Sequence, residues 1–209
     1  MEDRITVGFS TRPRTIHDFA GFPEALYRLH YPAPGDPDVA EKVRSLLAQA
    51  ELAPERDPER GLDHGAWIPL MRLFPSADIP IVPVSLQAQG GPKLHVALGR
   101  ALAPLQQENI LIVASGGLTH NLQALAPEAT APPRWVTEFQ TWFHAAMIEG
   151  RLDDLLEYQQ KAPHAAMSHP SEEHLLPLFV AIGAGSGRPE RVCSGYSYGT
   201  LAMDAYSFS

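Results

Sequence analysis

Apolar residues recur every three or four positions in several stretches of the chain, the pattern of helices that bury one face. Helices are therefore predicted over residues 22–31, 37–50, 67–73, 93–106, 135–148 and 175–182. Asp36 and Pro37 are a typical N-cap and first residue for the second of these helices. The charged, proline-containing residues 53–62 predict a surface loop.

Other segments have the pattern of strands. Residues 5–9 alternate apolar and polar positions, and residues 79–86 have the β-branched density of a buried strand, which Pro80 and Pro83 interrupt. The continuous apolar run 110–114 predicts a buried strand in a parallel sheet, and residues 198–208 predict a last strand. Strands that alternate with helices indicate an α/β fold with a mostly parallel central sheet flanked by helices. No linker is evident, so residues 1–209 are expected to form a single domain.

The composition of the chain excludes some classes of binding partner and indicates the cellular compartment. A formal net charge of −8 argues against nucleic acid or an anionic membrane as a partner. Cys193 is the only cysteine, which excludes an internal disulfide and a thiol-rich zinc site. The sequence contains no apolar run long enough to span a membrane and no apolar segment of a signal peptide at its start. A cytoplasmic protein is expected.

Nine histidines are the most informative feature of the composition. Those at the edges of predicted elements are His17, His64, His120 and His174. His120 follows a glycine-containing turn, residues 115–119, directly after the predicted strand at 110–114. An imidazole at that position is suited to binding a metal or moving protons, and a histidine that only bonds backbone is an equally open interpretation.

His174 is predicted to lie in the first turn of a helix whose N-cap is Ser171. The helix dipole there favours a neutral imidazole, which is the form that binds metals. Glu172 and Glu173 are ordinary acids for such a first turn. For His64 and His17 the sequence alone favours a structural role, with Asp63 as a helix cap. The remaining candidates are assigned no role and are expected on the surface or on a helix face: His30, His95, His144 and His164.

Several common catalytic motifs are missing from the sequence. It contains no Gly-x-Ser-x-Gly elbow, no Walker loop and no His-Glu-x-x-His motif. The glycine-rich residues 183–187 follow a predicted helix, so they indicate a helix end and loop, not a phosphate-binding turn. The residues by themselves support an α/β protein with a histidine-rich metal site.

The order and spacing of several segments resemble the DOPA-type class III extradiol ring-cleavage dioxygenases. These segments are Thr15–Phe19 with Gly21–Pro23, Tyr31–Gly35, Asp63–Trp67, Pro75–Pro80, Ser85–Gln87, Ala114–Leu122, His169–Leu178 and Gly199–Met203. The resemblance implies a phosphorylase/peptidase-like α/β core and a mononuclear metal site, with Fe(II) for catalysis or Zn(II) as in some relatives. It also implies O₂-dependent opening of a small, DOPA-like catechol. The exact catechol, the native metal and the oligomeric state are not predicted.

The same resemblance implies roles for individual residues. His120 and His174 match the family's metal-binding histidines, with Glu173 as an alternative carboxylate ligand. His64 matches an acid–base or substrate-contacting residue, and His17 is a second catalytic candidate. If residues 173 and 174 lie on one helix, their side chains point about 100° apart, which argues against both chelating one ion.

Two family motifs, a His-Gly-Ser-Pro turn and a Ser-Ala-His-Trp segment, do not occur in the sequence. A segment of roughly 45–50 residues, comparable to a βαβ unit, is therefore expected to be missing before Met1, with two strands and two metal-site histidines. Loss of those ligands predicts a weak or inactive enzyme. The alternatives are a non-catalytic relative that binds a small molecule or a protein, and a zinc hydrolase that uses His120 and His174.

Overall fold

The computed structural model describes residues 4–87 and 89–208, which fall into two compact units, one up to Gln87 and one from Ala88 onward. Each unit combines helices with short strands, so the predicted α/β class is confirmed. Within the described residues, no helix has the length and apolar character needed to cross a bilayer. The start of the chain, on which the expected lack of a signal peptide partly rests, lies outside the described residues. That the two units act as one catalytic domain stays a prediction.

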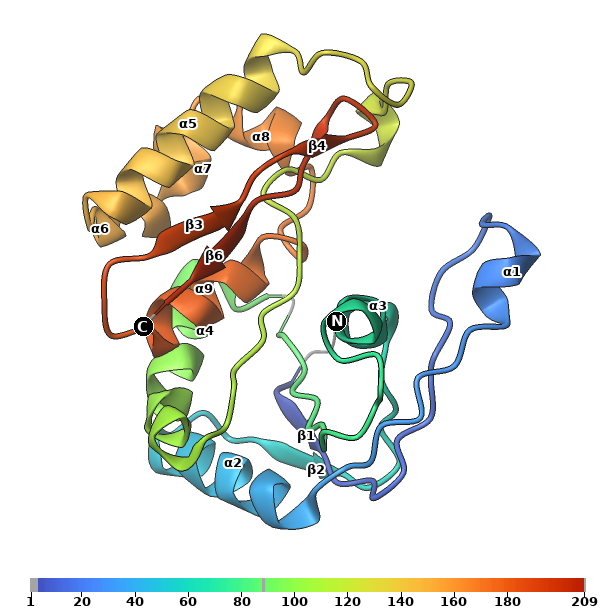
Figure 1. Ribbon diagram of the computed structural model, residues 1–209. Coiled ribbons are helices and arrows are strands. Elements are labelled where there is room, and N and C mark those ends of the chain that lie inside the picture. The colour runs from blue at the N-terminus through green and yellow to red at the C-terminus, as the bar shows by residue number, and fades with distance from the viewer. Residues whose placement is uncertain (1–3, 88, 209) are drawn as a thin grey trace. The chain divides into compact units, whose positions relative to one another are not determined.

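In the first unit, β1 (Thr6–Gly8) pairs in parallel with β2 (Glu55–Asp57), and α2 (Pro37–Gln49) lies beside them (Figure 1). The helix begins as predicted, because the carboxylate of Asp36 accepts hydrogen bonds from the first free N–H groups of the helix. The predicted loop at 53–62 is wrong over residues 55–57, which form β2. Two further helices belong to this unit, α1 (Glu24–Tyr27) and α3 (His64–Leu73).

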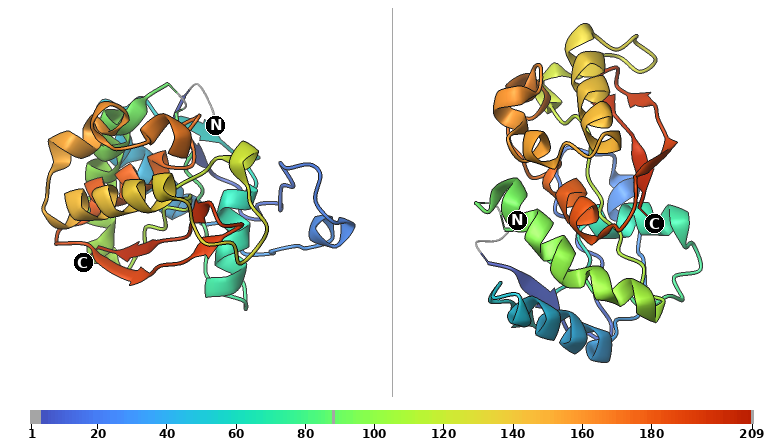
Figure 2. Two further views of the ribbon diagram at one scale, coloured as in Figure 1. Left: turned by 90° about the horizontal axis from the view of Figure 1, so that it is seen from above. Right: turned by 90° about the vertical axis from the view of Figure 1, so that its left-hand side faces the viewer.

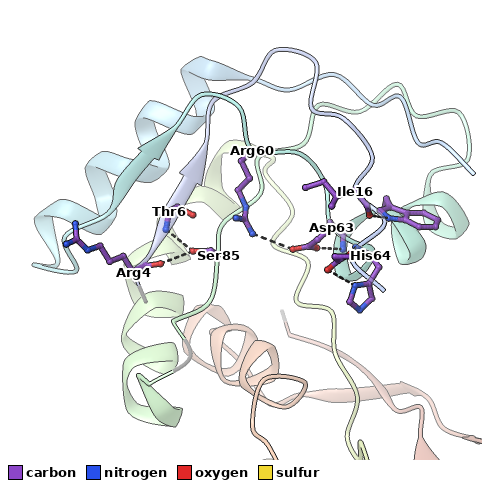
Figure 3. A network of polar contacts seen from close by, with 10 residues as sticks. Arg4, Thr6, Ile16, Arg60, Asp63, His64 and Ser85 are labelled. Carbon is purple, nitrogen blue, oxygen red and sulfur yellow. Dashed lines mark hydrogen bonds and ion pairs between the residues drawn. The ribbon is translucent and has the colours of Figure 1, made fainter. Parts of the chain in front are cut away.

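The buried strand predicted at 79–86 is not formed. Only Val84 makes a bridge, to β1, and Ile79 is largely exposed. Prolines in this segment supply no N–H for a ladder. Ser85 fixes the segment to β1 instead: its hydroxyl donates to the carbonyl of Arg4 and accepts from the N–H of Thr6 (Figure 3).

The second unit contains the helices predicted at 93–106, 135–148 and 175–182. Its elements are α4 (Gly91–Leu102), η1 (Ala103–Glu108), η2 (Leu122–Ala124), α5 (Arg134–Ile148), α6 (Leu152–Leu156), α7 (Tyr158–Lys161), α8 (Ala165–Ser168) and α9 (Leu176–Ala184). Helices α4 and α9 pack closely because both have a glycine at their contact (Figure 2). A Cβ on Gly99 would lie 2.0 Å from the carbonyl oxygen of Val180, and one on Gly183 would lie 2.1 Å from that of Val96.

Near the C-terminus the chain forms hairpins in place of the single strand predicted over 198–208. β3 (Glu190–Cys193) pairs antiparallel with β6 (Ala205–Ser207), and β4 (Tyr196–Ser197) pairs antiparallel with β5 (Leu201–Ala202). The β3–β6 ribbon lies along α5 (Figure 1). Among the described residues, β1 and β2 are the strands that pair in parallel, and one isolated bridge, from Thr15 to Leu62, is also parallel. A mostly parallel central sheet stays a prediction.

Residues 110–114, predicted as a buried strand, form no helix or strand and pair with no strand in the described part of the chain. The side chains of Leu111 and Val113 are 70% and 43% exposed. The prediction is therefore wrong for this segment. An apolar run expresses a preference for burial, and burial also requires a neighbouring strand and a covering layer.

Aromatic side chains form the centre of the second unit. Phe139 and Phe143 on α5, Tyr158 on α7 and Phe179 on α9 are each at most 1% exposed. The ring centroid of Phe143 lies 5.6 Å from that of Phe139, 6.2 Å from Tyr158 and 6.0 Å from Phe179. These offset contacts bring helices that are distant in sequence into one core.

Candidate functional site

The second unit brings the rings of His120 and His174 into face contact. Their centroids are 3.4 Å apart, and the ring planes differ by 10°. The two residues come from loops more than fifty positions apart in sequence, one after residues 110–114 and one before α9. The sequence therefore identified two histidines that the fold places together.

Backbone contacts between the two loops bring these rings together. The N–H of Gly117 donates to the carbonyl of His174 at 2.8 Å, and the N–H of His120 donates to the carbonyl of Ser168 at 2.9 Å. Gly116 is required at this contact, because a Cβ there would lie 2.1 Å from the carbonyl oxygen of His174. The glycines that predicted a sharp turn thus serve a close approach of two backbones.

A buried threonine ties the same loop to β5. The hydroxyl of Thr119, which is 1% exposed, donates to the carbonyl of Thr200 and accepts from the N–H of Ala202, both at 2.7 Å. One position after His120, the side-chain amide of Asn121 donates to the carbonyl of Met167 at 2.8 Å. The residues on both sides of His120 are therefore fixed by hydrogen bonds.

The predicted position of His174 within a helix is wrong. Helix α9 begins at Leu176, with Pro177 in its first turn, and His174 lies in the turn that precedes the helix. Ser171, predicted as the N-cap, donates its hydroxyl to the carboxylate of Glu173 at 2.7 Å. Proline is well suited to the first turn of a helix, where an N–H has no intrahelical partner, and this favours the later start.

Glu173 lies beside the His174 ring, with its carboxylate oxygen 3.4 Å from the Nδ1 of His174. Since neither residue lies in a helix, the argument from helical geometry against joint chelation does not apply to them. Partial burial raises the pKa of Glu173. Hydrogen bonds from Ser171 and the backbone, and the neighbouring His174, outweigh this effect and hold the pKa below its ordinary value. Glu173 as an alternative metal ligand stays a prediction.

His169 also belongs to this region, although the sequence analysis assigned it no role. It is 5% exposed, and its Nε2–H donates to the carbonyl of Leu118 at 2.8 Å. Its ring lies 5.7 Å from that of Phe139 and 6.5 Å from that of Tyr158. Burial lowers the pKa of His169 to about 4, so the ring is neutral near pH 7. Its only sequence signal is its place in the His-Pro motif before His174.

In the first unit, His64 is the first residue of α3 (Figure 3). It lies beside Asp18. The Asp18 carboxylate accepts the backbone N–H of His64 at 3.0 Å and lies 2.9 Å from the Nδ1 of its ring. Asp63 caps the helix as predicted, accepting the N–H of Ala66, and is also approached by Arg60. The sequence analysis missed Asp18, because residues 46 positions apart leave no spacing signal.

Partial burial raises the pKa of Asp18, but the hydrogen bonds from the N–H and ring of His64 outweigh it, and the pKa lies below its ordinary value. A carboxylate whose pKa falls on folding stabilises the fold above its unfolded-state pKa, and this contribution is lost as the pH falls through the folded-state pKa. We therefore expect Asp18→Asn to be less stable than the natural chain at pH 6. The difference should vanish in acid.

Urea denaturation of both proteins across the acidic range measures this difference. Glu59→Gln removes one exposed negative charge from the same unit and serves as the control. A gap between Asp18→Asn and the natural chain that stays constant with pH would contradict the assignment to the carboxylate.

His17 is held by backbone and aromatic contacts. Its Nε2–H donates to the carbonyl of Leu29 at 3.0 Å, and its ring lies 5.6 Å from Trp67 and 5.8 Å from Phe19. Trp67 in turn donates its indole N–H to the carbonyl of Ile16 (Figure 3). These contacts are those of a structural histidine, which is the interpretation that the sequence alone favoured.

Two of the histidines that were assigned no role, His95 and His164, differ in how well they match the expected positions. His95, expected on the surface or a helix face, lies on α4 but is 0% exposed, so a surface position is wrong for it. Its ring lies against its own helix, with Nδ1–H donating to the carbonyl of Gly91 at 2.6 Å. His164 is exposed and pairs with Glu138 at 2.7 Å.

The donor chemistry around His120 and His174 suits a first-row divalent metal. Imidazole nitrogens and carboxylate oxygens are the usual ligands of Zn(II) and non-haem Fe(II). Across the described residues, no group of three or more histidine, cysteine or acidic side chains is arranged to hold an ion.

Comparison with known proteins gives consistent matches over this chain. Residues 4–208 match the family model described as the catalytic LigB subunit of aromatic ring-opening dioxygenase. A 4,5-DOPA dioxygenase extradiol of Mirabilis jalapa is 40% identical over 204 residues, which cover 97% of this chain and 76% of the relative. A protein of the same name from Escherichia coli is 37% identical, covering 91% of this chain and 72% of the relative.

A solved structure is also similar. The crystal structure of an uncharacterized Escherichia coli protein, JW3007, matches with a TM-score of 0.82 and 31% sequence identity. The match covers 97% of this chain and 80% of that one.

Proposed function

The chain belongs to the family of the catalytic LigB subunit of aromatic ring-opening dioxygenases, and on that premise we propose that it opens a small, DOPA-like catechol. Extradiol cleavage inserts both atoms of O₂ and breaks a ring bond next to the hydroxyls. The observation that carries the proposal is the face contact of His120 and His174, two distant histidines that the fold brings together.

His120 and His174 are proposed to hold the metal, with Glu173 as an alternative carboxylate ligand. A bound Fe(II) would supply the redox chemistry that activates O₂, whereas Zn(II) has no accessible second oxidation state. The loop hydrogen bonds hold the backbones that carry the two imidazoles close together before any ion arrives, which lowers the entropic cost of assembling the site.

His64 is proposed as the acid–base residue. Its contact with Asp18 orients the ring through Nδ1 and leaves Nε2 to move a proton. His17 remains the second candidate for this role, although its Nε2–H is already donated to Leu29. A ring that bonds backbone through one nitrogen has only the other nitrogen for chemistry.

We also propose the finer features of the fold and setting: a mostly parallel central sheet in a phosphorylase/peptidase-like core, and a cytoplasmic location. The parallel pairing of β1 with β2 supports the first. A single, exposed and unpaired cysteine supports a reducing compartment.

Anaerobic loading followed by oxygen tests the function. The chain is mixed with Fe(II) without air, and then receives DOPA and O₂ while O₂ uptake and visible absorbance are followed. We expect a yellow semialdehyde to form slowly, with one O₂ consumed per ring opened, because two family motifs with metal-site histidines do not occur in this sequence.

Other results would point elsewhere. Catechol that binds without O₂ uptake would indicate a non-catalytic relative, and ester or amide hydrolysis that continues without O₂ would indicate a zinc hydrolase. Either result in place of ring opening contradicts the proposal.

A further inference from the structure

We propose that His169 is a positioning residue that holds the His120 loop against the segment carrying His174. Its Nε2–H donates a hydrogen bond to the carbonyl of Leu118, two residues before His120. His169 itself lies five residues before His174 in the sequence. This inference rests on the proposed function, because the two rings matter for catalysis only if they bind the metal.

The bond of His169 is well placed to control the loop. The carbonyl of Leu118 faces a ring that is 5% exposed, so water does not readily replace the donor. A carbonyl oxygen only accepts hydrogen bonds, so the proton of the neutral ring must be on Nε2. The side chain therefore has one fixed tautomer and one fixed partner.

Neighbouring contacts form a clamp around the same stretch. On one side of Leu118, the N–H of Gly117 reaches the carbonyl of His174, and on the other, the N–H of His120 reaches the carbonyl of Ser168. Both are backbone contacts, and the first depends on the close approach that Gly116 allows. Asn121 adds a side-chain bond to Met167 after His120, and His169 adds one to Leu118 before it. The ring of His169 packs against Phe139 and Tyr158 in the aromatic core.

Aromatic packing and hydrogen bonding can be separated by two substitutions. His169→Phe keeps a ring against Phe139 and Tyr158 and removes the donor. His169→Gln removes the ring and keeps an amide N–H that can reach the Leu118 carbonyl. His95→Phe is the matched control, because His95 is also fully buried and donates to a carbonyl, that of Gly91 in its own helix.

The first readout needs no metal. Stacked rings displace each other's proton resonances, so NMR of the metal-free chain reports the His120–His174 contact directly. We expect the displacement of the resonances to be lost in His169→Phe and to be kept in both His169→Gln and His95→Phe. Thermal denaturation of all three variants separates a local change in the loop from general loss of stability.

The second readout is the affinity for Co(II), a spectroscopic substitute for the native ion. Loss of a residue that orients metal ligands typically costs about 10- to 100-fold in affinity. We expect that loss for His169→Phe, and an affinity near that of the natural chain for His169→Gln.

Unchanged ring resonances and Co(II) affinity in His169→Phe would overturn the proposal. So would equal losses in His169→Phe and His169→Gln that track their melting temperatures, since those indicate packing alone. If the rings respond as expected but the chain opens no catechol, positioning stands and the dioxygenase function fails. If the chain opens catechol but the imidazole resonances do not change in His169→Phe, the dioxygenase function stands and the positioning role fails.

Discussion

Replacement of His174 by alanine is expected to reduce both the divalent-metal affinity of the chain and its rate of catechol opening by more than about 100-fold. Loss of an outer hydrogen-bond partner of a metal ligand already costs about 10- to 100-fold, and loss of the ligand itself should cost more. The effect should be large here because His174 and His120 face each other as a pair, and alanine leaves the ion one imidazole short.

Titration with Co(II) and O₂ uptake with catechol measure the two losses separately. His164→Ala is the control, since His164 is an exposed histidine of the same unit that pairs with Glu138. His120→Ala should behave like His174→Ala. An affinity that survives in both variants would show that the ion binds elsewhere, and the proposed ligand roles would be wrong.

Replacement of Phe143 by alanine is expected to lower the free energy of unfolding of the second unit by about 3–5 kcal/mol. Phe143 is 0% exposed and contacts four other aromatic rings, two on α5 and one each on α7 and α9. Alanine leaves a cavity that these rings fill only in part, so lost burial and lost contacts add. Typical domain stabilities are about 5–15 kcal/mol, so this loss is a large fraction of the whole.

Chemical denaturation followed by circular dichroism measures this loss. Phe22→Ala makes the same chemical change at a position 55% exposed, and it should shift the midpoint little. A free energy of unfolding for Phe143→Ala within about 0.5 kcal/mol of the natural chain would contradict the aromatic core as the stabilising centre, because that is the usual range for surface substitutions.

Features encoded by neighbouring residues were predictable from the sequence. The cap at Asp36 and the helix that follows it depend on short-range hydrogen bonds and one buried stripe, and both are present. His120 and His174 were identifiable because each lies in a short segment with a distinctive residue pattern. Their meeting could be expected from family resemblance, whereas spacing alone left a structural histidine equally open.

Features that depend on distant partners were not predictable. Asp18 became the partner of His64, and His169 the partner of Leu118, through contacts that no local pattern encodes. The start of α9 was misplaced because Ser171 has the chemistry of a cap but bonds to Glu173. In each case a tertiary contact or a proline decided between locally similar alternatives.

The exposed run 110–114 has a consequence for handling the protein. Between Glu108 and Glu128 the chain contains no lysine, arginine, aspartate or glutamate, so no charge repels an incoming strand beside this run. A segment with β-branched side chains whose backbone pairs with no strand is a template on which other copies of the chain can add strands. Aggregation of concentrated samples is thus expected to begin at residues 110–114, without any unfolding of the core.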